Sequence, residues 1–534
     1  MMWGGNSKKI FFHKDKNGNE QYDILSIYLD GKIQEIITNN SKCILQDAGN
    51  NGKLILLTSD MEKQENLYKY DLRKEELTKL TNYKTAVRHG VLSSEGTHIS
   101  YSTNELDNPR NRDPYICKID GTDKRKLHVG EKGKACVILD WSHDDESLLL
   151  ADSSKNTIGG GIYDIREEEV NWIGSEKYEE RPVSFIPNKK TFLAYRIKKA
   201  AWVPTLFKPN GSIKELNIKD GFTQFFRGGN GGEFISKKEC VLTYTKPNNK
   251  KDICVYDLEN HSYKTMVNAE YGNIDPERFV DAEYITYESA DGVEIGALFY
   301  DSGERPSPAV VVLHGGPHDQ SIKRFNIYAQ FLVSRGYSVL QPNYRGSIGR
   351  GEEFKRMIHN DWGGKEQADI ANGCRWLKDK EWISEDKVAI YGGSFGGYAT
   401  YMQLVKYPEL WAAGVASRGI TDLIRLYKKK PLAILRRQMG HPKNNIELWK
   451  ERSPLTYVDN IKRPILILHS VNDARIPVEQ SRIFKEALEE KGWIKGKDFD
   501  YKEFEKEGHK TTKSQTKIKV FRELESFLKK HLKN

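Results

Sequence analysis

Ser394 stands in a stretch of residues whose types and order fit nucleophilic catalysis. The segment GGSFG at 392–396 has the pattern G-x-S-x-G, directly after the apolar run 387–391 and before a run at helical spacing. A serine held on a sharp turn between a strand and a helix exposes its hydroxyl, and glycines tolerate the crowded backbone of such a turn. We therefore predict that Ser394 is a nucleophile.

A serine nucleophile needs a base to take its proton and an acid to orient that base. In folds with this turn, the acid and then the histidine follow the serine along the chain. Asp473 follows the apolar run 464–468 and is the predicted acid, with Asp422 as its competitor. Two histidines come after Asp473. His531 lies on a predicted helix near the last residue, so His509, in a loop directly after the run 499–504, is the predicted base.

The oxyanion formed during acyl transfer needs hydrogen-bond donors that are already in place. We expect one from the backbone N–H of Phe395 and the second from Gly316, in the segment HGGPH at 314–318, which follows the run 310–313. Gly-Gly-Pro between His314 and His318 precludes the helix that would make them a metal pair. The glycine-rich segments 157–161 and 228–233 lack the Lys-Ser/Thr of a phosphate loop, so we expect no metal and no cofactor.

The elements that must position these residues lie in the carboxyl-terminal half. Apolar runs at 293–300, 309–313, 337–341, 387–391, 412–416, 464–468 and 499–504 alternate with helical patterns at 325–334, 365–378, 398–406, 479–490 and 518–532. This alternation predicts a mostly parallel sheet covered on both faces over residues 279–534. Together with the G-x-S-x-G turn at Ser394, it predicts an α/β-hydrolase domain. The segment 271–279, with Asp275-Pro276 as its breaker, is the predicted junction.

The amino-terminal half, residues 1–278, repeats with a nearly constant period. Apolar runs around Ile10, Ile55, Ile99, Leu148, Phe192 and Val241 are 44 to 49 residues apart, and most are followed by a second run ending near an acidic turn. Three or four short strands in each period are typical of propeller blades. We predict a β-propeller with six units, and a weak repeat leaves room for a seventh. An irregular β-sandwich is the alternative.

Composition limits the class of protein. A chain of 534 residues exceeds one hydrophobic core, and 38% hydrophobic residues exclude a mostly disordered chain. No apolar run reaches the length of a membrane span, and the first residues lack a secretion signal, so we expect a cytoplasmic protein that binds no membrane. The six cysteines are spread out and predicted to be reduced. The net charge of +9 is mixed along the chain, which argues against nucleic-acid binding.

Seven motifs occur in order in the second half: HGGPH, NYRGSIGRGEEF, DWGGKEQAD, GGSFGGY, SPLTYV, HSVNDARIP and EGH. Together they resemble the catalytic domain of the prolyl oligopeptidase family of serine peptidases, and the acylaminoacyl-peptidase branch is the most similar. The resemblance implies the triad Ser394, Asp473 and His509, oxyanion donation from Gly316, and substrate binding by Arg475.

The resemblance also implies a propeller that caps the active site and admits short peptides, including peptides with a blocked amino terminus. This chain departs from the pattern in having six visible units and no apparent amino-terminal helix. The segment Tyr178-Glu179-Glu180 is similar to the paired acids with which dipeptidyl peptidases hold a free amino terminus, but its context differs, and we interpret it as a solvated acidic turn.

The sequence therefore predicts a serine peptidase for short peptides. Two alternatives stay open: a carboxylesterase on the same scaffold, and a propeller interaction protein whose hydrolase half is inactive. The side-chain preference, cleavage at chain ends or interiors, and assembly into a homo-oligomer are left open.

Overall fold

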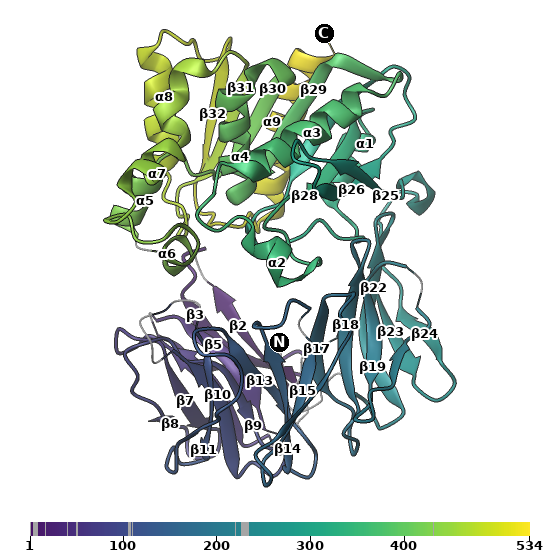
Figure 1. Ribbon diagram of the computed structural model, residues 1–534, viewed down its shortest axis with the longest axis vertical. Helices are drawn as coiled ribbons and strands as arrows, with labels where there is room; N and C mark the ends of the chain where they lie inside the picture. Colours follow the sequence, from purple (N-terminus) through teal and green to yellow (C-terminus); the bar gives the residue numbers. More distant parts are fainter. Residues whose placement is uncertain are drawn as a thin grey trace.

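The computed structural model describes residues 2–3, 9–15, 18–39, 41–49, 52–104, 108, 111–157, 159–218, 220–225, 234–430 and 432–533. Figure 1 shows two halves, with the β-rich amino-terminal half below and a sheet covered by helices above. The predicted glycine-rich segment at 228–233 lies outside the described residues. Among those that are described, no helix is long and apolar enough to cross a membrane.

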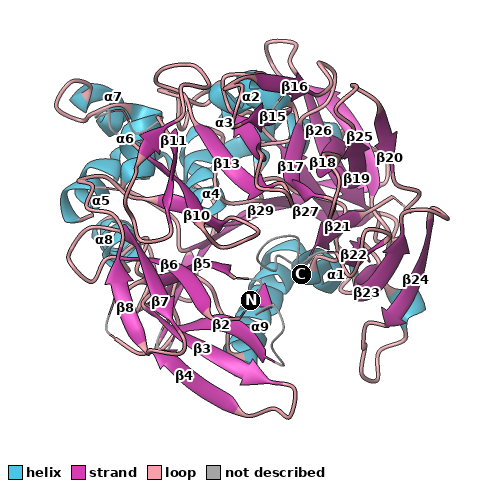
Figure 2. Cartoon of the chain, turned by 90° about the horizontal axis from the view of Figure 1, so that it is seen from below, coloured by secondary structure: helices cyan, strands magenta, loops and turns pink. Residues whose placement is uncertain are grey.

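The amino-terminal half is a β-propeller with six units in the described residues. Strands β1 to β16 form four separate four-stranded antiparallel sheets, and β17 to β24 form two further units that a parallel pairing of β19 with β21 joins into one eight-stranded sheet. Figure 2 shows the units following one another around a ring, with α1 and α9 of the other half visible between the first and last units. The strands are β1 Met2–Trp3, β2 Lys9–Asp15, β3 Tyr22–Tyr28, β4 Ile33–Ile37; β5 Cys43–Ala48, β6 Leu54–Ser59, β7 Asn66–Asp71, β8 Glu76–Lys79; β9 Arg88–Leu92, β10 His98–Thr103, β11 Asp113–Lys118, β12 Arg125–Lys126; β13 Cys136–Trp141, β14 Ser147–Asp152, β15 Gly160–Asp164, β16 Val170–Ile173; β17 Glu180–Phe185, β18 Phe192–Lys198, β19 Ala201–Phe207, β20 Ile213–Glu215; and β21 Phe222–Phe225, β22 Glu239–Lys246, β23 Asn249–Asp257, β24 Ser262–Val267.

The recurring residues found in the sequence occupy the same place in every unit. Ile10, Ile55, Ile99, Leu148, Phe192 and Val241 lie on β2, β6, β10, β14, β18 and β22, the second strand of each unit. A small sheet cannot bury both faces alone, and buried apolar clusters accordingly join each unit to the next. Hydrogen bonds repeat with the units as well: Asp47 accepts from the Leu92 N–H, and Asp140 from the Phe185 N–H, each at 2.8 Å. The predicted propeller is confirmed.

The carboxyl-terminal half contains one eight-stranded sheet in the order β25-β26-β28-β27-β29-β30-β31-β32. β25 and β26 pair antiparallel to their neighbours, and every pair from β28 to β32 is parallel. The bounds are β25 Glu283–Glu288, β26 Glu294–Tyr300, β27 Ser307–Leu313, β28 Ser338–Asn343, β29 Ile383–Gly393, β30 Ala413–Ser417, β31 Ile465–Ser470 and β32 Phe499–Phe504.

Helices cover both faces of this sheet. One buried cluster packs α3, α4 and α8 against one face, and a second packs α1 and α9 against the other. The bounds are η1 Pro276–Arg278, α1 Ile327–Val333, α2 Gly351–Arg356, α3 Lys365–Lys378, α4 Phe395–Lys406, η2 Pro408–Leu410, α5 Leu423–Lys429, α6 Ala433–Met439, α7 Ile446–Glu451, η3 Pro454–Asn460, α8 Glu479–Glu490 and α9 Ser514–Leu532. The predicted α/β-hydrolase arrangement is confirmed.

Sequence patterns missed the short elements β25, α2, α5, α6 and α7. Each short helix has six or seven residues, fewer than two turns, so it shows too little periodicity to be recognised. The six cysteines are free and buried. The domain boundary between residues 278 and 279 stays a prediction, since the link from Val267 to Glu283 contains only η1.

Candidate active site

Ser394 sits on a strained turn between β29 and α4. Its φ of 59° and ψ of −121° lie in a region that residues with a Cβ rarely adopt. The flanking glycines are sterically required: a Cβ on Gly392 would lie 2.2 Å from the Gly396 carbonyl oxygen, and one on Gly396 would lie 2.6 Å from that of Leu313. The Ser394 N–H donates to the Ser417 carbonyl at 2.9 Å, which ties the turn to β30.

The structure brings Ser394, His509 and Asp473 together. His509 Nε2 lies 2.9 Å from Ser394 Oγ. On the other side of the ring, His509 Nδ1 lies 2.9 and 2.8 Å from the two carboxylate oxygens of Asp473. With Nδ1 donating to the carboxylate, Nε2 is free to accept the serine proton.

Asp473 is held as a carboxylate. Its side chain is fully buried, and Oδ1 accepts the backbone N–H groups of Arg475 and Ile476 at 2.9 Å each. Burial by itself raises the pKa of the Asp473 carboxyl, but the hydrogen bond and charge of His509 outweigh burial, so the pKa lies below its ordinary value. The carboxylate is therefore available to orient the imidazole.

A second histidine, His469, lies behind the acid, with Nε2 3.7 Å from Asp473. Its ring is buried, its Nε2 donates to the Ile476 carbonyl at 2.9 Å, and its Nδ1 lies 2.7 Å from Ser481 Oγ. Burial lowers the pKa of His469 to about 4. His469 is therefore neutral near pH 7, and its role is to hold the loop that carries Asp473.

The two predicted oxyanion donors belong to two segments next to Ser394, the start of α4 and the loop after β27. Phe395 is the first residue of α4, where backbone N–H groups have no acceptor within the helix. Gly316 has a φ of 121°, and a Cβ there would lie 2.7 Å from the backbone nitrogen of His318, so glycine is required. Its neighbour Gly315 packs on the nucleophile, since a Cβ at 315 would lie 3.4 Å from Ser394 Cβ.

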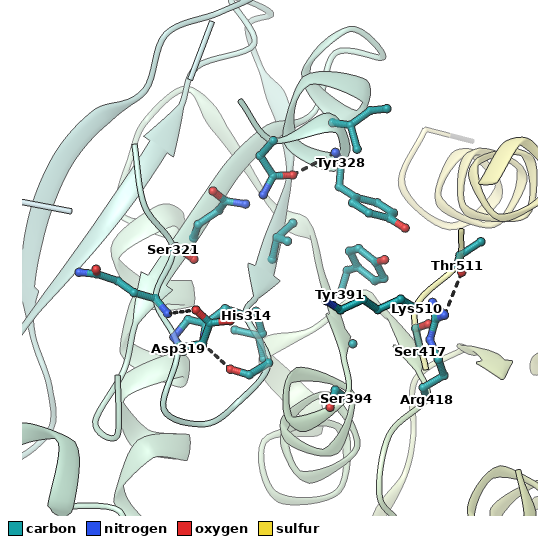
Figure 3. Close-up of a pocket in the computed structure, with 18 of the residues that line it drawn as sticks. His314, Asp319, Ser321, Tyr328, Tyr391, Ser394, Ser417, Arg418, Lys510 and Thr511 are labelled. Atoms are coloured by element: carbon teal, nitrogen blue, oxygen red, sulfur yellow. Dashed lines mark hydrogen bonds between the residues drawn. The ribbon is translucent and has the colours of Figure 1, made fainter. Parts of the chain in front are cut away.

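A cavity of about 510 Å³ opens beside the nucleophile. Ser394 and His509 line it, together with residues from the segment after β27, from α1 and from α9. Figure 3 shows His314 and Asp319 on one side of Ser394, and Ser417, Arg418, Lys510 and Thr511 on the other. The reacting hydroxyl thus faces space that a substrate group can enter.

Arg475, predicted to bind substrate, forms an ion pair with Glu20 of the propeller. Glu20 lies in the turn between β2 and β3, which also brings Gly18 against Gly508, the residue before His509. Arg475 does not line the cavity described above. Sequence reasoning missed Glu20 and Gly18 because nothing local connects residues 18–20 with a loop almost 490 residues further on.

The interpretation of Tyr178-Glu179-Glu180 as a solvated acidic turn is wrong, because both carboxylates are buried. Glu179 pairs with Arg181 and accepts the backbone N–H groups of Gly349 and Gly351, at 2.5 and 3.0 Å, across the domain interface. Glu180 instead pairs with Arg196 at 2.7 Å.

The pKa values of the Glu179 and Glu180 carboxyl groups shift in opposite directions. Burial raises the pKa of Glu179, but Arg181 and the two N–H groups outweigh it, so the pKa is lowered. The pKa of Glu180 is raised, because burial dominates there. Glu179 is therefore a charged contact between the propeller and the segment that contains α2, where the two halves meet (Figure 1).

The other candidate residues named from the sequence make their contacts outside the Ser394–His509–Asp473 hydrogen bonds. Asp422 caps α5, accepting the Arg425 N–H at 2.9 Å, and His531 packs on Phe527 within α9. His314 and His318 make hydrogen bonds to Ser347 and to the Gly346 carbonyl. Among the residues with a described position, no group of three or more His, Cys, Asp or Glu could hold a metal ion.

This geometry is suited to acyl transfer. His509 can take the Ser394 proton as the oxygen attacks a carbonyl, and the buried Asp473 carboxylate can stabilise the resulting imidazolium. The protonated imidazole can then give the proton to the leaving group, and water can hydrolyse the acyl-enzyme in the same way.

Comparison with known proteins finds a family match within the second half. Residues 323–534 match the family described as "Prolyl oligopeptidase family". Dipeptidyl aminopeptidase BIII from Pseudoxanthomonas mexicana is 36% identical over 196 residues, which are 35% of this chain and 28% of that one. The chain covers 28%, 31% and 39% of three curated relatives, so it aligns with well under half of each.

Solved structures match over nearly the whole chain. The crystal structure of a puromycin hydrolase gives a TM-score of 0.79 at 17% identity, covering 99% of this chain and 93% of that one. The acylaminoacyl peptidase of Pyrococcus horikoshii gives 0.77 at 19% identity, covering 99% and 87%. At such identities the likeness shows the shared fold, a propeller joined to an α/β-hydrolase domain.

Proposed function

We propose that this protein is a serine peptidase that hydrolyses short peptides, including N-acylated ones, because residues 323–534 match the prolyl oligopeptidase family. The observation that carries the proposal is the hydrogen-bonded chain from Ser394 Oγ through His509 to the buried carboxylate of Asp473. A purely structural turn would have no reason to hold a strained serine against an oriented imidazole.

In the proposed reaction, Ser394 attacks the peptide carbonyl while His509 takes its proton. The N–H groups of Gly316 and Phe395 bind the oxyanion, and Arg475 holds the peptide near the scissile bond once it exchanges Glu20 for substrate. The acylaminoacyl peptidase among the structural neighbours supports blocked amino termini as substrates. The propeller restricts access, which favours short chains over folded proteins.

A carboxylesterase on the same scaffold is the rival enzyme, since one triad serves amides and esters alike. Turnover of acetylated aminoacyl anilides and of nitrophenyl esters separates the two. We expect both to be cleaved; ester hydrolysis with no anilide cleavage at any peptide length would contradict the peptidase proposal.

The alternative that is not an enzyme is a propeller interaction protein whose hydrolase half is inactive. We expect a fluorophosphonate probe to label the protein on one residue, and Ser394→Ala to abolish labelling while the near-ultraviolet circular dichroism stays unchanged. A folded wild-type protein that takes no label would support the interaction module instead.

A further inference from the structure

The cavity beside Ser394 has an unusual balance of charge. Four cationic side chains line it, from Arg324, Arg418, Lys510 and Lys517, and Asp319 is the carboxylate among its lining residues. None of the four cations forms an ion pair with a carboxylate in the described part of the chain. The charged side chains that line the cavity are therefore mostly cationic.

Arg418 shows that this charge is built into the fold. It follows β30 with a φ of 51°, and its backbone N–H donates to the Leu468 carbonyl at 2.8 Å. The half-buried guanidinium donates to Thr511 Oγ1 at 2.9 Å and approaches Ser470 Oγ at 3.4 Å. Both partners are neutral hydroxyls, so they orient the guanidinium without compensating its charge.

The neighbouring Ser417 gives a second observation that points to a ligand in this cavity. It is 1% exposed, lines the same cavity, and its Oγ has no hydrogen-bond partner among the residues that the structure describes. Buried hydroxyls are normally paired, so an unpaired one that lines a cavity calls for an explanation. Ser417 lies beside both Ser394, whose N–H its carbonyl accepts, and Arg418.

We infer that this cavity binds a carboxylate of the substrate, with Arg418 as the main contact and Lys510 as a second cation. Guanidinium groups suit carboxylates because two parallel hydrogen bonds match the two oxygens, and partial burial strengthens the charge interaction. The inference rests on the proposed function, since it names the class of peptide that Ser394 acts on. The carboxylate comes from the free carboxyl terminus of a short peptide or from an acidic side chain near the scissile bond.

The test measures binding without turnover, in the Ser394→Ala background, by titration calorimetry. Three acetylated tripeptides differ only in their last residue: alanine with a free carboxylate, alanine amide, and glutamate amide. We expect the carboxylate-bearing peptides to bind at least about tenfold more tightly than alanine amide at low salt. The tighter of the two identifies the source. Adding Arg418→Met should reduce the preference to about twofold or less.

Arg522→Met is the matched control, because Arg522 is an exposed arginine on α9 that does not line the cavity. It should keep the full preference. If Arg418→Met does not fold, Lys510→Met gives the second variant, with a smaller loss of preference expected for this exposed lysine.

Equal binding of the three peptides, or no binding of any of them at millimolar concentration, would overturn the carboxylate inference. The proposed function fails in a different way. Peptides that bind with the expected preference but are not cleaved by the wild-type protein would overturn the peptidase and leave the carboxylate site standing. Cleavage of all three peptides at equal kcat/KM would support the peptidase and overturn the carboxylate site.

Discussion

Gly18 in the first propeller unit lies in backbone contact with Gly508 in the loop that carries the candidate base. A Cβ on Gly508 would come within 2.0 Å of the Gly18 carbonyl oxygen, and a Cβ on Gly18 within 2.4 Å of the Gly508 nitrogen. The next residue is His509, whose imidazole forms a hydrogen bond with Ser394 Oγ. The propeller therefore contacts the loop of the triad histidine at the residue before His509.

This contact predicts a loss of activity from Gly18→Ala. Its φ of 75° makes alanine strained by about 1 kcal/mol, and the new methyl group would push the His509 loop away from the nucleophile. We expect kcat to fall by roughly 10- to 100-fold, the cost of a displacement near 1 Å. Gly31→Ala is the control: its φ is 85° but a Cβ there meets nothing within 4 Å. Equal losses in the two variants would argue against the contact.

Asp473→Asn should nearly abolish activity without unfolding the protein. An amide cannot stabilise the imidazolium, and it favours the wrong tautomer of His509, which costs about 10⁴ in kcat in such triads. Steady-state turnover of an acetylated aminoacyl anilide at pH 7 measures this. Asp422→Asn, in the competing acid, should keep kcat within about twofold, and a large loss there would reassign the acid.

The buried neutral histidines predict that stability falls as the pH drops from about 6.5 to about 4. His469 has a folded pKa of about 4, below its unfolded value of about 6.5, so in this window the unfolded chain binds a proton that the folded protein does not. Its share amounts to about 1.4 kcal/mol per pH unit. Urea unfolding as a function of pH should therefore show a shallower slope in His469→Gln. The exposed His143→Gln should leave the slope unchanged, and an unaltered slope in His469→Gln would contradict the assignment.

Glu179→Gln should loosen the interface between the propeller and the hydrolase half. One Glu179 oxygen pairs with Arg181 and the other accepts both the Gly349 and the Gly351 N–H groups. The substitution removes the charge and leaves a single oxygen for these two sets of donors. We expect faster hydrogen exchange in residues 345–356 and a free energy of unfolding lower by about 2 kcal/mol. Glu176→Gln, exposed three residues earlier, is the control. Unchanged exchange at 349 and 351 would show that these bonds do not hold the interface.

Much of this architecture could be predicted because it depends on the types and spacing of residues that are close together in the sequence. The recurrence of Ile10, Ile55 and their equivalents reports the spacing of strands in each unit, and the glycines around Ser394 report a backbone too crowded for a Cβ. Such patterns involve only residues that are neighbours in the sequence, so they can be recognised without the tertiary structure.

Contacts between distant segments could not be predicted in this way. Glu179 and Glu180 have the composition of a solvated turn, and only backbone amides 170 residues further on, together with Arg181 and Arg196, make their burial tolerable. Arg475 likewise meets Glu20 because the first propeller unit lies over the loop after β31.

By itself, the sequence determined the repeat of the propeller, the alternation of strands and helices, and the order of serine, acid and histidine, since each depends on the steric and apolar character of adjacent residues. Only the tertiary structure decided that Asp473 rather than Asp422 faces His509, that the propeller touches the His509 loop at Gly18, and that unpaired cations gather beside Ser394. The physical reason is that hydrogen bonding and charge pairing act over a few ångströms in space, and the folded path of the chain alone brings these partners within that range.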